Sequence, residues 1–156
     1  METEYKNGAY EYALLIKREI LALDTLLENW GEIQEDGERV RNGDAPEMED
    51  DLLTECVAAQ NELGFDEWPE DVVSSYLNDT CLELTVLRAV NGDLYEPARE
   101  RIEILRTCGG PRCDITRDMN DGGMVEIRVH DGRDSSTIRV SVGTLAASLD
   151  ELAGCY

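Results

Sequence analysis

Residues 124–142 have the sequence MVEIRVHDGRDSSTIRVSV, and this stretch decides the fold class of the chain. Apolar and polar residues alternate across 125–130 and again across 137–142, which is the period of a strand with one buried face. Between them, 131–134 reads Asp-Gly-Arg-Asp, a composition typical of tight turns. The stretch therefore predicts two antiparallel strands joined by a short connection.

The same alternation occurs earlier in the second half of the chain. It predicts strands at 82–86, 99–107 and 113–117. Within 99–107, Ile102 and Ile104 are expected to face the core, because charged residues occupy the alternate positions.

Turn and cap residues separate these elements. Asn91-Gly92 favours a tight hairpin between the first two strands. Thr144 is expected to cap a closing helix that ends at Gly154.

The first half of the chain has a helical period. From 9 to 30, apolar residues recur at alternating spacings of three and four, at Ala13, Ile16, Ile20, Leu23, Leu27 and Trp30. We expect Gly31 to end this helix and the following residues to begin an acidic loop.

Two shorter helices are expected next. Asp44-Ala45-Pro46-Glu47 has the pattern of a helix start, and Gly64 the position of its end, with Leu52, Cys56, Ala59 and Leu63 as the apolar face. Trp68-Pro69-Glu70-Asp71 is expected to begin a third helix with Pro69 near its first position and a core of Val72, Val73, Tyr76 and Leu77.

The predicted architecture is α+β. A helical half (1–80, about three helices) packs on an antiparallel meander of four to five strands, and a C-terminal helix covers part of the same face (81–156). We expect residues 1–156 to be one domain, because three short helices bury little by themselves. The alternative is a two-lobed arrangement with a hinge near 77–80.

Charge restricts the partners. The chain has 156 residues, 35 of them acidic and 14 basic, so its net charge is −21. Nucleic acids and anionic membranes are bound through cationic side chains, which argues against direct contact with either. Residues 1–80 hold 22 acids and 5 bases, whereas 81–156 hold 13 and 9. The negative charge is therefore concentrated in the helical half.

Motifs for catalysis or cofactors are weak. Five cysteines without a secretory signal indicate reduced thiols in a cytoplasmic protein. Cys108 and Cys113 are the one close pair, and their spacing does not match a zinc site, although a disulfide or metal between them stays open. His130 is the single histidine, and no nucleophile or phosphate-binding motif accompanies it. We expect no enzyme activity, no metal and no cofactor.

The acidic half allows three interpretations. It is a solubilising surface, a halophilic adaptation, or a set of carboxylates that imitates the phosphates of a nucleic acid. For the third, the expected partner-binding residues lie in the acidic clusters of the first half, together with one aromatic anchor: Glu35, Asp36, Glu38, Glu47, Glu49, Asp50, Asp51, Asp66, Glu67, Trp68, Glu70 and Asp71.

Part of the second half resembles known sequences. The runs concerned include LRTCGGP at 105–111, VEIRV at 125–129 and IRV at 138–140. Over 82–152 the chain is similar to small acidic proteins of unassigned function encoded by phages and mobile elements. This resemblance implies a role like that of anti-CRISPR or anti-restriction proteins, and it supplies no catalytic residues.

Two functions are expected from these observations. The first is a non-enzymatic inhibitor or adaptor, in the host cell cytoplasm, that binds a basic nucleic-acid-binding protein or complex such as a CRISPR effector or restriction enzyme. The alternative is a homo-oligomeric structural or accessory protein that uses the outer sheet face, where Arg101, Glu103, Glu126, Arg128 and Arg139 are placed. A monomer favours the first and a salt-insensitive dimer the second.

Overall fold

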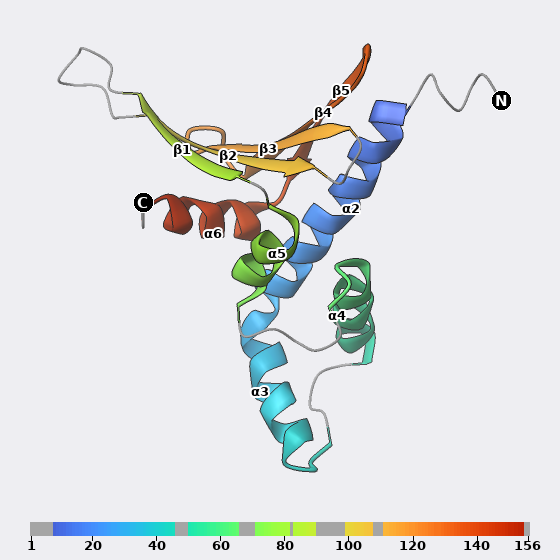
Figure 1. The fold of residues 1–156 in the computed structure, drawn as a ribbon. Coiled ribbons are helices and arrows are strands. Elements are labelled where there is room, and N and C mark those ends of the chain that lie inside the picture. The colour runs from blue at the N-terminus through green and yellow to red at the C-terminus, as the bar shows by residue number, and fades with distance from the viewer. Residues whose placement is uncertain are drawn as a thin grey trace.

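The strands of the second half form one sheet. The computed structural model describes residues 8–45, 50–65, 71–81, 83–89, 99–107 and 111–154 (Figure 1). The sheet is antiparallel and keeps the chain order β1 (Glu83–Ala89), β2 (Arg99–Thr107), β3 (Arg112–Asp118), β4 (Met124–Asp131) and β5 (Asp134–Ser141). The predicted α+β class and five-stranded meander are confirmed.

A row of apolar side chains crosses the sheet and sets its register. Five residues, one from each strand, lie opposite their neighbours: Leu84, Ile104, Ile115, Ile127 and Ile138. A shift of one residue in any strand would move its member of this row to the other face. The hydrophobic pattern therefore specifies both the buried face and the pairing.

The connection between β4 and β5 is the turn that the sequence predicts. Asp131 pairs with Asp134, so Gly132 and Arg133 form the expected tight turn, and Gly132 has a φ of +62° that glycine adopts without strain. Asn91-Gly92 lies outside the described residues.

Two helices cover the apolar face of the sheet. Helix α2 (Gly8–Glu28) packs on β4 and β5, and α6 (Gly143–Gly154) packs on β2, β3 and β4. Figure 1 shows both helices on the same side of the sheet. Helices α4 and α5 also pack on α2. Helix α2 therefore joins the sheet to the rest of the helical half.

The prediction that Gly31 ends the first helix is wrong. Helix α3 (Trp30–Arg41) follows α2 after one residue, and Ile33 is fully buried in it. A glycine inside a helix costs about 1 kcal/mol, and burying an isoleucine contributes roughly 1.5–3 kcal/mol, so the helix continues through Gly31. Gly43, with a φ of +86°, ends α3 instead, and the Asp44 N–H donates to the Arg39 carbonyl at 2.9 Å.

The next two helices have the expected apolar faces. Helix α4 (Asp50–Glu62) ends near Gly64, where the φ of +73° confirms the predicted terminus, while residues 46–49 of its expected start lie outside the described part. Helix α5 (Val72–Thr80) begins later than predicted. Its N-cap is Asp71, whose carboxylate accepts the Ser74 N–H at 2.9 Å, and Pro69 lies outside the described residues.

Carboxylates from distant elements cap two helices. The Leu145 N–H of α6 donates to Asp24 of α2 at 2.8 Å, so Asp24 caps this helix where Thr144 was predicted. The Ala9 N–H of α2 donates to Asp134 of β5 at 3.1 Å. These two bonds fix α2 to the sheet and to α6, and one hydrophobic cluster includes residues of both halves.

Candidate functional site

The candidate site consists of exposed carboxylates on two helices. We call it the α3–α4 acidic face, and it comprises Glu32, Glu35, Asp50, Asp51, Glu55 and Glu62. Helices α3 and α4 lie away from the sheet, at the far end of α2 (Figure 1). The face is therefore accessible to a large partner without interference from the sheet.

The carboxylates of α4 lie along one side of the helix. Asp51, Glu55 and Glu62 are four and seven residues apart, which places them within a narrow arc of the helix surface. All three are exposed, whereas Cys56 and Ala59 are buried against the core. Packing of the apolar side thus forces the acidic side into solvent.

One acid of α3 and one acid of α4 lie near the buried thiol of Cys56. Burial raises the pKa of the Cys56 thiol, and the negative charges of Glu55 and Glu32 raise it further. Glu55 belongs to the same helix as Cys56, but Glu32 belongs to α3. The negative charges of Glu32 and Glu55 therefore act on the same buried group.

The sequence from 42 to 87 contains no cation that could balance this negative charge. That segment contains thirteen acidic residues and no Lys, Arg or His. On α3, Arg39 is partly buried near the end of the helix. Such a surface attracts a cationic partner over a distance of about a Debye length, roughly 8–10 Å at moderate salt.

The structure brings some of the predicted site residues together and not others. Glu35, Asp50, Asp51 and Asp71 are exposed as expected. Asp36 is only 3% exposed, so it cannot contribute to an exposed surface, and that part of the prediction is wrong. The side chain of Glu38 on α3 is not described. Six further predicted residues lie wholly outside the described part: Glu47, Glu49, Asp66, Glu67, Trp68 and Glu70.

Sequence reasoning missed three members of the acidic face. The expected helix end at Gly31 places Glu32 in a loop, whereas Glu32 lies in the first turn of α3. Glu55 and Glu62 do not belong to a dense acidic cluster, so composition does not single them out. Their spacing from Asp51 on a predicted helix is the signal that identifies them.

Some of these acids also stabilise the fold. Asp50 and Asp51 lie in the first turn of α4, where a negative charge interacts favourably with the helix dipole. Asp71 is the N-cap of α5. Glu32 has the same position in the first turn of α3, whereas Glu35, Glu55 and Glu62 do not, so these three are the stronger candidates for a role in binding.

A buried polar cluster lies apart from this face, between the sheet and the helices. The guanidinium of Arg106 on β2 donates to the Glu19 carboxylate of α2 and to the Tyr76 hydroxyl of α5, the latter at 2.8 Å. The Tyr76 hydroxyl donates to Glu19 at 3.1 Å, and burial raises the pKa of Tyr76. The cluster joins three elements and keeps its hydroxyl protonated, which is the behaviour of a structural lock.

The described residues include no group of three or more His, Cys, Asp or Glu that is arranged to hold a metal ion. Cys56 and Cys81 are free thiols, and burial raises the pKa of both. Cys108, the other member of the close pair in the sequence, lies outside the described part.

None of the described helices has both the length and the apolar character that crossing a bilayer requires. No protein-family model, curated protein or solved structure matches the chain.

Proposed function

We propose that this protein is a non-enzymatic inhibitor or adaptor, of phage or mobile-element origin, that binds a basic surface of a nucleic-acid-processing complex in the host cell cytoplasm. The observation that supports it is the α3–α4 acidic face, where exposed carboxylates lie on two helices and residues 42–87 contain no Lys, Arg or His. A CRISPR effector or a restriction enzyme is the candidate target.

Charge spacing favours electrostatic competition over close imitation of DNA. The three carboxylates on one side of α4 extend over about 16 Å at 1.5 Å per residue. One DNA strand presents a charge every 3.4 Å or so, which is more than twice as dense. Glu32 and Glu35 of α3 increase the density without reaching that of a duplex. We infer a partner whose cationic groove accepts a broad negative surface.

The outer face of the sheet gives less support to the homo-oligomer. Its arginines already form ion pairs within the chain: Arg101 with Glu103 at 3.4 Å, Arg128 with Glu126 at 2.8 Å, and Arg139 with Asp121. These charges are balanced locally, so a second copy is not needed to satisfy them. We therefore do not propose self-association through this face.

The proposal is tested by competition with DNA. Labelled duplex DNA is bound to purified CRISPR effectors and restriction enzymes, and its fluorescence anisotropy is followed as this protein is added at 50 and 300 mM salt. We expect displacement of DNA from at least one of these proteins, weaker at the higher salt because the contact is between charges. Absence of displacement from every protein at low salt would overturn the proposal.

A charge-matched pair of variants locates the contact. One variant carries Glu35→Gln, Asp51→Asn, Glu55→Gln and Glu62→Gln, and the control carries Glu83→Gln, Glu103→Gln, Asp114→Asn and Glu126→Gln. Both lose four negative charges, but only the first loses them from the acidic face. We expect about tenfold weaker displacement for the first and little change for the control. Equal weakening would mean that net charge alone governs the effect.

A further inference from the structure

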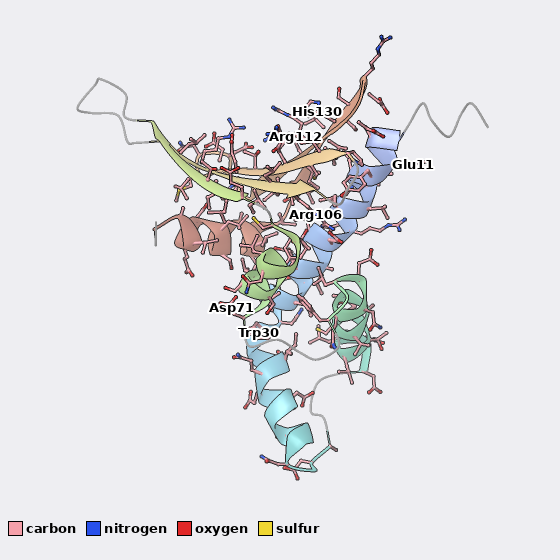
Figure 2. All side chains as sticks on the ribbon, viewed as in Figure 1. Glu11, Trp30, Asp71, Arg106, Arg112 and His130 are labelled. Carbon is pink, nitrogen blue, oxygen red and sulfur yellow. The ribbon has the colours of Figure 1, made fainter. Side chains whose placement is uncertain are left out.

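A pocket opens where helices α2, α3, α5 and α6 meet. Its volume is about 330 Å³, and it is bounded by the end of α2, the start of α3, the start of α5 and one side of α6. Figure 2 shows Trp30 and Asp71, which both line it, close together at the junction of these helices. The volume is at the lower end of the range for small-ligand sites, which suits a single side chain.

The lining combines an aromatic wall with two carboxylates. Trp30, Leu27, Val72, Val73 and Leu152 supply apolar surface, and Asp71 and Glu151 supply the negative charge. Indole is the aromatic group that attracts cations most strongly. The pocket is thus complementary to a side chain that is both flat or apolar and positively charged.

The start of α5 by itself would attract an anion, since the N-terminus of a helix carries partial positive charge. Asp71 occupies that position and accepts the Ser74 N–H at 2.9 Å, which offsets the positive end of the helix. Glu151 on α6 adds a second negative charge to the lining. The electrostatics of the pocket therefore favour a cation.

We propose that this pocket receives an arginine side chain of the basic partner. A guanidinium stacks on an indole face and forms paired hydrogen bonds with a carboxylate, whereas the compact ammonium of lysine does neither as well. The inference rests on the proposed function, because it assumes a partner with a cationic surface. It adds an anchor of defined geometry to the diffuse attraction of the acidic face.

The test uses Trp30 as its own reporter. Trp68→Phe leaves Trp30 as the single tryptophan, and blocked hexa-arginine and hexa-lysine peptides are titrated at low ionic strength. We expect the arginine peptide to change Trp30 fluorescence and to bind about tenfold more tightly than the lysine peptide. Asp71→Asn, which retains a good N-cap and removes the charge, should weaken the arginine peptide several-fold.

Filling the pocket separates it from the acidic face. Ser148→Phe on α6 adds bulk to the lining without changing charge, and Ala147→Phe on the exposed side of the same helix is the matched control. We expect Ser148→Phe to abolish the preference for arginine and to leave a salt-sensitive residual affinity, and Ala147→Phe to preserve the preference. Thermal melts of both variants establish that they are folded.

The outcomes distinguish the two proposals. If both peptides bind equally, Trp30 does not respond and Ser148→Phe has no effect, the pocket proposal is overturned while the acidic face retains its role. If neither peptide binds at low salt, both proposals fall. If Ser148→Phe does not fold, the Asp71→Asn titration decides, and an unchanged affinity for the arginine peptide overturns the pocket.

Discussion

Arg106 is the residue whose replacement tests the architecture most severely. Its side chain is 10% exposed and joins β2 to Glu19 of α2 and Tyr76 of α5, so three elements depend on one guanidinium. The guanidinium carbon of Arg106, Cζ, also lies 5.8 Å from the centroid of the Tyr76 ring, within reach of a cation–π contact. Arg106→Met removes the charge and keeps most of the apolar stem.

The expected cost follows from what the substitution leaves behind. Breaking a buried ion pair costs about 3–5 kcal/mol when the remaining charge is isolated. The Glu19 side chain is 22% exposed and keeps its bond from Tyr76, so it regains part of its hydration. We therefore expect a loss of about 2–3 kcal/mol in the free energy of unfolding, or roughly 4–12 °C in Tm for a chain of this size.

The assay is urea unfolding followed by circular dichroism. Arg128→Met is the control, because its pair with Glu126 is exposed and should contribute no more than about 1 kcal/mol. The double variant Arg106→Met/Glu19→Met should be more stable than the sum of its two single losses predicts, since no charge remains buried. Equal stability of Arg106→Met and Arg128→Met would mean that the buried cluster contributes no more than an exposed ion pair.

Three further predictions concern single groups. The raised pKa of Tyr76 means that stability present below about pH 10 is lost as pH rises above that value, and Tyr76→Phe should flatten this loss in alkaline urea titrations; an unchanged slope would contradict it. Asp24→Ala should cost about 1 kcal/mol by removing the cap of α6, and Asp24→Asn much less, as thermal melts would show; equal losses would mean that the cap contributes nothing. Cys56 should react slowly with a thiol reagent near pH 8, and Glu32→Gln should increase the reaction rate by lowering the pKa of the thiol. An unaltered rate would mean that the charge of Glu32 on α3 does not act on Cys56 of α4.

Local patterns predicted the fold where neighbouring residues determine it. The hairpin at 124–142 was predictable because alternation and a turn composition lie within nineteen residues. The expected helix end at Gly31 is wrong because the burial of Ile33, a tertiary effect, outweighs the local preference of glycine. The caps of α2 and α6 were not predictable, since Asp134 and Asp24 lie more than a hundred residues from the N–H groups that they accept.

The candidate site was predictable in charge but not in shape. Composition located the negative charge in the first half, and the dense cluster at Asp50 and Asp51 is exposed on α4. The burial of Asp36 depends on how α3 packs, which composition does not reveal. The pocket beside Trp30 needs four segments to meet, so no single stretch of sequence carries its signal.

A structure of the protein bound to the complex that it displaces from DNA would show which surface makes the contact. We expect Glu35, Asp51 and Glu55 to face lysine and arginine side chains of the target, with α3 and α4 forming most of the interface. An interface made mainly by the outer face of β1–β5, with α3 and α4 in solvent, would contradict it.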